Sequence, residues 1–367
     1  MSFFKPVRKI ARMAEKLIAE PAPKKRRKYN PARVGQRVAA SQGIQLTLFT
    51  YDASHVEERG LQPEDDLRLP ERKVSWLNIE GTDKAQIERL AMIFGIHPLL
   101  VEDILNVGQR AKMDEINNVV FCLLPMLYYN ENTGMVDSEQ VSLVLVYDGV
   151  LSFQEEACRD VFDPVRTRLR NNSGGRLREG SPDFLLYTLL DVIVDSYFAI
   201  IERLDQRAEV LEDEIIGHMH NDASAKVALL RREVLTVMRA ISPVREVITG
   251  LLRSESPLME DRNEKYYKDI LDHILHAIDT ADSMRDTTST LLDLTYNQVN
   301  MRTNDIVKVF TIITTLLAPA TVIGGIFGMN FDVIPLSHQK DGFFLMVALM
   351  LVVPLIMLWW FRRKGWF

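Results

Sequence analysis

The chain has 367 residues, of which 47% are hydrophobic and 26% charged, with a formal net charge of −6 and a pI near 5.8. This length fits two or three domains. The slight acidity argues against the strongly basic surface of nucleic-acid-binding proteins, so no nucleic-acid partner is expected. Cys122 and Cys158 lack the spacing of a metal site or a disulfide framework, and we expect reduced thiols.

Residues 1–40 are predicted to be a basic N-terminal tail. Charged side chains interrupt every apolar stretch between Met1 and Glu20, so no cleavable signal peptide is expected. A second basic run, Lys24–Lys28, extends the charge. Two interpretations stay open: an amphipathic helix on an anionic membrane surface, or a disordered tail without a specific role.

Residues 41–180 are predicted to form a domain of strands with interleaved helices. Thr82 is the expected N-cap of the first helix, with Asp83 in its positively polarised first turn, and Gly95 ends it. The Asp148-Gly149 pair is typical of a tight hairpin turn. Apolar patterns indicate strands at 43–51, 74–79, 119–129, 141–147 and 150–153, and helices at about 82–94 and 98–106.

Residues 181–305 show only helical patterns and are predicted to form a long-helix stalk, after a polar connector at 171–180. Neither glycine nor proline occurs from Glu264 to Ala318, so this segment predicts one helix of roughly 80 Å, at 1.5 Å per residue. That helix would join the stalk to the C-terminal region without a break. The expected helices span about 182–218, about 223–253, and 264 onward.

Residues 306–367 are predicted to form a two-helix membrane hairpin. The apolar runs 306–327 and 343–361 each approach the roughly 20 residues needed to cross the hydrocarbon core. The outer loop, 328–342, is too short for anything but an antiparallel pair. The loop has only Lys340 as a basic residue, so both termini are expected in the cytoplasm. The basic residues that flank the spans are Arg302, Lys308, Arg362, Arg363 and Lys364.

One face of the first apolar run carries polar and small residues at steps of three, four or seven, which places them on one side of a helix. Two helices alone cannot enclose a path, so this face lines a pore only if the chain forms a homo-oligomer. Threonines in membrane helices also bond to their own backbone or pack against a neighbour. Both interpretations stay open for the stripe, which comprises Asn304, Thr311, Thr314 or Thr315, Ala318, Thr321 and Gly325.

The end of this run, Phe327-Gly-Met-Asn-Phe331, resembles the signature of the CorA family of divalent-cation channels. It stands where that family has it, at the end of the first of two C-terminal spans. Three further stretches are similar to the family, at 94–110, 267–273 and 304–313. The chain is therefore identified as a member, and the resemblance covers nearly everything after residue 40.

The resemblance implies an α+β fold: a cytoplasmic α/β/α sandwich joined by very long helices to a two-helix C-terminal transmembrane hairpin. It also implies a funnel-shaped homopentamer in the cell inner (plasma) membrane. Gly328, Met329 and Asn330 would form the selectivity filter, whose neutral oxygens suit a Mg²⁺ ion that keeps its water shell. Phe310 would be a hydrophobic constriction that gates by dewetting. With the stripe, the expected pore-lining residues are Asn304, Val307, Phe310, Thr311, Thr314, Ala318 and Thr321.

The family also binds regulatory divalent cations between neighbouring subunits, where bound Mg²⁺ would bridge acidic side chains and hold the pore shut. The expected ligands are Glu102, Asp103, Asp269 and, one turn further on the same face, Asp272. His273 and His276 suggest either a transition-metal site or ordinary surface histidines. Many relatives have a glutamate in the outer loop where this chain has Leu336, which weakens the ring of carboxylates that would concentrate cations.

The expected function is passive, potential-driven uptake of Mg²⁺, and also of Co²⁺ and Ni²⁺, regulated by cytoplasmic Mg²⁺. Two alternatives stay open: a zinc- or cobalt-dedicated transporter of the ZntB-like branch, and a membrane sensor or scaffold that conducts nothing. An enzyme is not expected, because the sequence has no nucleophile–base set, phosphate-binding glycine loop or zinc-hydrolase motif.

Overall fold

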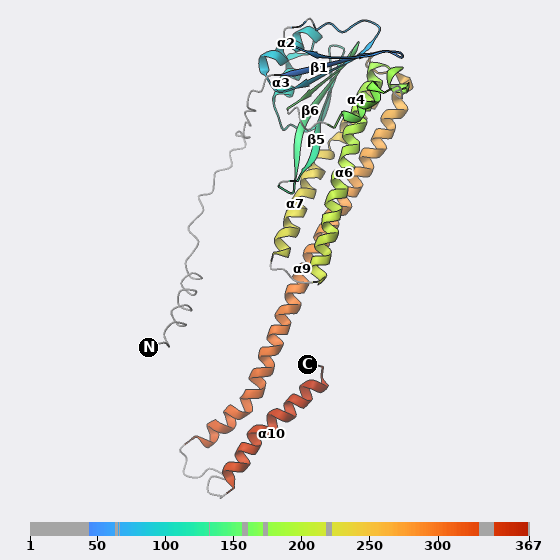
Figure 1. Ribbon diagram of the computed structural model, residues 1–367. Helices are drawn as coiled ribbons and strands as arrows, with labels where there is room; N and C mark the ends of the chain where they lie inside the picture. The colour runs from blue at the N-terminus through green and yellow to red at the C-terminus, as the bar shows by residue number, and fades with distance from the viewer. Residues whose placement is uncertain are drawn as a thin grey trace. The chain divides into compact units, whose positions relative to one another are not determined.

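The computed structural model describes residues 44–62, 65, 67–131, 133–155, 161–171, 175–217, 222–329 and 341–365 (Figure 1). All of its helices and strands lie within Ser41–Phe367, which is one compact unit. The basic segment 1–40, Asn330 and most of the loop between the two C-terminal apolar runs lie outside the described residues.

Within the described residues, a seven-stranded sheet has the order β2-β1-β3-β7-β6-β5-β4. β3 and β7 are parallel, and the other neighbours are antiparallel. The strands are β1 (Gln45–Tyr51), β2 (Val56–Leu61), β3 (Val74–Glu80), β4 (Lys112–Ile116), β5 (Val119–Asn130), β6 (Met135–Val146) and β7 (Gly149–Gln154). Five of them confirm the predicted strands, whereas the edge strands β2 and β4 were not predicted. The charged sequence Glu57-Glu58-Arg59 of β2 lacks apolar alternation, as is common at a sheet edge.

Two of the tight hairpin turns differ from what was predicted. Asn117 and Asn118, with φ of 55° and 59°, connect β4 to β5, and asparagine tolerates this left-handed region. Between β6 and β7, Val146 pairs with Gly149, so the turn is Tyr147–Asp148 and the predicted Asp-Gly turn is wrong by one residue. Glycine is still required at 149, because a Cβ there would clash with the carbonyl oxygen of Ser75 on β3.

Helices cover both faces of the sheet. α2 (Lys84–Phe94) and α3 (Pro98–Leu105) pack on one face, and α4 (Asp163–Arg170) and α6 (Pro182–Gly217) pack on the other. Asp83, rather than Thr82, is the N-cap of α2, since its carboxylate accepts from the Gln86 N–H at 3.0 Å. Gly95 ends α2 in the left-handed conformation, as predicted. The mixed helix-and-sheet architecture of the prediction is therefore confirmed.

After the sheet and α4, the elements of the described residues are all helices: α5 (Gly175–Arg178), α6, α7 (Ala223–Ile241), α8 (Val244–Arg253), η1 (Asp261–Asn263), α9 (Glu264–Phe327) and α10 (Gly342–Arg363). The predicted single helix at 223–253 is wrong, because it divides into α7 and α8 at Pro243, which has no N–H for the helical ladder. α5 lies inside the predicted connector. α9 has 64 residues, which gives a length of roughly 95 Å.

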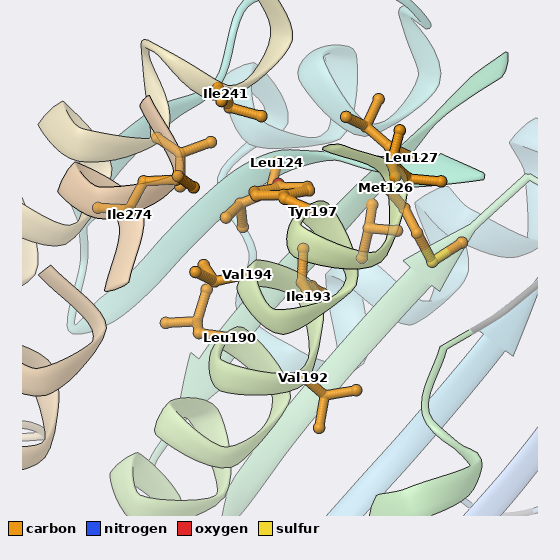
Figure 2. Packing of buried hydrophobic residues seen from close by; sticks show 14 of the residues in the cluster. Leu124, Met126, Leu127, Leu190, Val192, Ile193, Val194, Tyr197, Ile241 and Ile274 are labelled. Atoms are coloured by element: carbon orange, nitrogen blue, oxygen red, sulfur yellow. The ribbon is translucent and has the colours of Figure 1, made fainter. Parts of the chain in front are cut away.

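The main hydrophobic core lies where α6 packs between the sheet and α9. Figure 2 shows Leu190, Ile193 and Tyr197 of α6 in a cluster that also contains Leu124 of β5 and Ile274 of α9. The Tyr197 hydroxyl donates to the Pro125 carbonyl oxygen at 2.6 Å. This side chain therefore joins α6 to β5 by an apolar contact and a hydrogen bond.

Buried Asp183 fixes the start of α9 against the start of α6. Its Oδ2 accepts from Asn263 Nδ2 and from the Glu260 N–H, both at 2.9 Å. The Tyr267 hydroxyl donates to the Asp183 carbonyl oxygen at 2.8 Å. Because these groups are buried, each bond would be costly to break, so the first turn of α9 is firmly anchored.

Three helices of the described chain are long and apolar enough to cross a membrane: α6, η1 with α9, and α10. The apolar window of α6 is 56% buried within the chain, whereas those of α9 and α10 are 6% buried. α6 thus has its apolar residues covered by the sheet and its helical neighbours. The uncovered apolar segments belong to α9 and α10, the helices that contain the two predicted spans.

Candidate ion pathway and cation sites

α9 and α10 carry matching stripes of partly buried residues, in steps of three or four, along which the two helices pack. A Cβ added to Gly324 of α9 would lie 3.2 Å from the terminal methyl of Met350, so the glycine permits close approach of α10. The stripes comprise Lys308, Ile312, Thr315, Leu316, Pro319, Ala320, Ile323 and Phe327 on α9, and Gly342, Met346, Val347, Met350, Val353, Pro354, Met357 and Phe361 on α10.

The predicted pore-lining residues lie on the other side of α9. Since successive helical residues turn by about 100°, this set lies nearly opposite the stripe that faces α10. All seven side chains are exposed in the single chain: Asn304, Val307, Phe310, Thr311, Thr314, Ala318 and Thr321. The face that carries them is therefore available to a neighbouring copy or to a path for ions.

The three threonines of this face use their hydroxyl protons within α9. Thr311 donates to the Val307 carbonyl oxygen at 2.8 Å, Thr314 to that of Phe310 at 2.9 Å, and Thr321 to that of Leu317 at 3.0 Å. Each hydroxyl oxygen keeps lone pairs that can accept further hydrogen bonds. These oxygens are suited to accept hydrogen bonds from the water shell of a cation.

Two large apolar side chains precede the threonines on the same face. Phe310 is 64% exposed and Val307 is 55% exposed. Both side chains are thus far more exposed than the core residues of the described chain. A ring of such side chains around an axis would form the kind of apolar constriction that excludes water when narrow.

α9 ends at the motif that was predicted to form the filter. The N–H of Gly328 donates to the Gly324 carbonyl oxygen at 2.9 Å, and that of Met329 to the Ile326 oxygen at 3.3 Å. A Cβ on Gly328 would approach the Gly324 oxygen to 3.0 Å, so glycine suits this tight last turn. Asn330, the predicted ion-facing residue, lies outside the described residues.

The acidic residues predicted on α3 lie at its C-terminal end. Glu102 is exposed, whereas Asp103 is half-buried and its Oδ2 lies 2.6 Å from Lys112 Nζ on β4. The backbone oxygen of Asp103 accepts from Gln140 Nε2 at 2.9 Å. These bonds of Asp103 go to residues of the sheet domain.

Two acids that the sequence analysis did not select, Asp191 and Asp195 of α6, face His273 of α9. One ligand atom from each of the three residues lies within 4.8 Å of the others, an arrangement that could hold a metal ion. His273 Nδ1 is buried without a hydrogen-bond partner, 3.8 Å from the Asp195 carboxylate. His276, which was considered with His273, instead packs against Phe198 at a ring distance of 5.6 Å.

The environment of Asp191 disfavours its negative charge. Burial raises the pKa of Asp191 to about 6, and the charges of Asp195 and then Asp269 add to this effect, while His273 and Arg168 oppose it. Burial, followed by the charges of Asp191 and Asp269, raises the pKa of Tyr187 to about 12. Asp269 and Asp272 themselves are exposed on α9. A cation near Asp191, Asp195 and Asp269 would therefore relieve their mutual repulsion.

A signal for these α6 acids was present in the sequence. Asp191 and Asp195 are four residues apart within an otherwise apolar stretch, which puts two carboxylates on one helical side. What the sequence alone did not provide is the packing of α6 against α9, which brings His273 to the same place.

Comparison with known proteins identifies the family of the chain. The family described as CorA-like Mg²⁺ transporter protein matches residues 71–363. The cobalt/magnesium transport protein CorA of Thermotoga maritima is 41% identical over 293 residues, which are 80% of this chain and 83% of that protein.

Two solved structures show the fold. The complete CorA magnesium transporter of Methanocaldococcus jannaschii has a TM-score of 0.74 and 23% identity, covering 87% of this chain and 98% of its own. The ZntB cytoplasmic domain of Vibrio parahaemolyticus is more distant, with a TM-score of 0.56 and 13% identity, covering 71% of this chain and all (100%) of its own. The family match and the close relative together show that the chain belongs to the family of CorA-like Mg²⁺ transporters.

Proposed function

We propose that the chain is one subunit of a homopentameric membrane channel that conducts hydrated divalent cations. Mg²⁺ is the main ion, and Co²⁺ and Ni²⁺ also pass. Transport is passive and driven by the membrane potential, with both termini in the cytoplasm. The names of the relatives support magnesium and cobalt as cargo, since CorA of Thermotoga maritima is described as transporting both.

The observation that carries the proposal is the division of α9 into two faces. One face packs against α10, and the opposite face presents an uncovered row of threonine, alanine and large apolar side chains. In a lone hairpin, the threonine hydroxyl oxygens would face lipid, which offers no hydrogen-bond donors to them. In a ring of copies, α9 would line the axis and α10 would lie outside it. The threonine oxygens would then accept from the water shell of the passing ion.

The selectivity follows from neutral ligands. Mg²⁺ dehydrates reluctantly and is usually bound with several waters retained. A ring of Asn330 side chains at the outer end of α9, with Gly328 and Met329, would offer amide oxygens to that shell without stripping it. Carboxylates in the same place would bind the ion more tightly and release it more slowly.

Regulation would use the acids of the cytoplasmic domain and the stalk. Glu102 and Asp103 of one subunit would face Asp269 and Asp272 of the next, with Asp191 beside them. Mg²⁺ between these carboxylates would hold the subunits together and keep the pore closed. Without the ion, repulsion among the acids would favour opening.

The test of this regulation is Mg²⁺ flux into proteoliposomes with Mg²⁺ present or absent on the side of the sheet domain. Asp103→Asn with Asp269→Asn is expected to conduct regardless of Mg²⁺, while the wild type is inhibited. Asp205→Asn, an exposed acid on α6, is the control and should behave as the wild type. Unchanged Mg²⁺ inhibition in the double variant would refute the regulatory role.

One observation favours a second candidate, a zinc- or cobalt-dedicated transporter of the ZntB-like branch. His273 offers a nitrogen ligand next to Asp191 and Asp195, and imidazole suits Zn²⁺ and Co²⁺ better than Mg²⁺. Flux measured separately for each ion distinguishes the candidates. Zinc flux that exceeds magnesium flux at equal concentration would support the second and contradict the first.

A further inference from the structure

The end of α10 carries three positive charges, and a fourth lies on the stripe of α9 that faces α10. Arg362, Arg363 and Lys364 follow directly on Phe361, which is buried. Ile312 of α9 is also buried, and it lies about as far along α9 from Gly324 as Phe361 lies along α10 from Met350. Lys308 is one turn before Ile312 on the same stripe.

Lys308 lies on the stripe of α9 that faces α10. It is half-buried, whereas the described residues 301–307 and 309–311 around it on α9 are exposed. A lysine in such a place can bury its aliphatic stem against apolar neighbours while its ammonium group stays at the surface. The four basic residues thus lie at the ends of the facing stripes of α9 and α10, away from the residues that join the two helices.

These cations have no acidic partners within the described part of the chain. None of the four forms an ion pair there, and Asp305 of α9 is the nearest acid along the sequence. Instead, the Arg363 guanidinium lies 5.6 Å from the Trp359 ring and Lys364 Nζ lies 5.7 Å from the Trp360 ring. Cations held by indole faces keep donors free for a further anion.

Two tryptophans indicate the depth in the membrane at which the basic end of α10 lies. Trp359 is 60% exposed and Trp360 is 50% exposed, at the boundary between an apolar run and a basic end. Exposed tryptophans at such a boundary lie at the headgroup level of a bilayer. The anion available there in quantity is the phosphate of a phospholipid.

We propose that Lys308, Arg362, Arg363 and Lys364 form a binding site for the phosphate of an anionic phospholipid in the leaflet next to the sheet domain. The inference rests on the proposed membrane channel, because it requires α10 to face lipid. The bound headgroup bridges α9 and α10 where α9 enters the bilayer, next to Phe310 in the sequence. Anionic lipid would therefore stabilise the position of α9 at the constriction.

The test is retention of phosphatidylglycerol against phosphatidylcholine by the full chain, extracted from vesicles containing both lipids and counted by native mass spectrometry. The wild type is expected to retain phosphatidylglycerol preferentially. Arg362→Gln with Arg363→Gln and Lys364→Gln should reduce that preference at least about tenfold, since each cation near the surface contributes several-fold. Lys308→Gln alone should reduce it by a smaller factor.

Two matched variants separate charge from folding. Arg362→Lys with Arg363→Lys keeps the charges and should keep the preference, whereas Arg231→Gln with Arg232→Gln, exposed on α7, should not alter it. Equal retention of both lipids by the wild type, or full preference in the triple variant, would refute the site. Displacement of the lipid by millimolar inorganic phosphate would also refute it, because the site would then select a free anion. Lipid preference in a protein that passes no ion would leave the site standing and overturn only the channel.

Discussion

α6 and the C-terminal hairpin have similar hydropathy but opposite surroundings. The apolar window of α6 has mean hydropathy 1.9 and is 56% buried within the chain, whereas those of α9 and α10 have 2.0 and 2.6 and are 6% buried. Burial of apolar surface is the dominant favourable term in folding, so one chain completes the core around α6 by itself. Within one chain, the hairpin leaves most of its apolar residues uncovered. The comparison teaches that hydropathy identifies apolar helices, while packing decides which of them belong to a membrane.

The largest effect is expected at Asn330, which follows α9 in the segment between the two spans. Asn330→Ala should abolish Mg²⁺ flux, because it removes the amide oxygens proposed to accept from the ion's water shell, while the oligomer still assembles. Flux into proteoliposomes and size-exclusion chromatography measure the two properties. Asn171→Ala, an exposed residue after α4, should leave both unchanged. Normal flux in Asn330→Ala would remove this residue from the selectivity filter.

A pair of leucines tests the comparison through stability. Leu190 of α6 is fully buried and Leu351 of α10 is 62% exposed. Leu190→Ala should lower the free energy of unfolding by about 2–5 kcal/mol, as large-to-small changes in a core do. Leu351→Ala should change the unfolding of the sheet domain by less than about 0.5 kcal/mol. Denaturant unfolding in detergent measures both, and equal losses would contradict the contrast between the two regions.

Two adjacent threonines distinguish the two faces of α9. Thr314 is exposed on the proposed pore face, and Thr315 is half-buried toward α10. Thr314→Val keeps the shape but removes an oxygen that accepts from the hydrated ion, so Mg²⁺ flux should fall about fivefold, equivalent to one hydrogen bond. Thr315→Val should leave flux nearly unchanged. A larger loss in Thr315→Val would mean that the face toward α10 carries the ion.

The smallest effect is expected at Asp191. Its pKa is raised from 3.8 to about 6 in the folded chain, so folding disfavours the ionised form of Asp191. The protein therefore keeps its full stability below pH 4 and loses part of it as pH rises from 4 through 6. Near pH 7 without divalent cations, Asp191→Asn should stabilise the protein by on the order of 1 kcal/mol, after allowance for the partial exposure of the carboxylate. The gain should disappear as pH falls from 6 to 4.

Urea unfolding at several pH values measures this gain, with Asp205→Asn as the exposed control. Added Mg²⁺ should stabilise the wild type more than Asp191→Asn. A pH-independent gain would mean that the charge of Asp191 is not the cause.

Much of this architecture was predictable because local patterns determine it. Central strands such as β5 have apolar runs, and α9 was predicted from the absence of helix breakers. The edge strand β2 was missed because its residues are charged, and the break at Pro243 was missed because the apolar period continues across it. The first error arises where tertiary context overrides local composition, whereas the second overlooked a local helix breaker.

The candidate sites divide in the same way. The polar face of α9 follows from helical periodicity, and in the structure α10 leaves this face uncovered. The meeting of Asp191, Asp195 and His273 depends on the packing of α6 against α9, which periodicity does not encode. The contact proposed between Asp103 and Asp269 joins two subunits, so it remains a prediction.

The most direct measurement of the central account is ion flux into proteoliposomes that contain the purified oligomer, with an inside-negative potential and each divalent cation supplied in turn. The account predicts that Mg²⁺ enters and that entry stops when Mg²⁺ is present on the side of the sheet domain. An assembled oligomer that passes no divalent cation under either condition would contradict it.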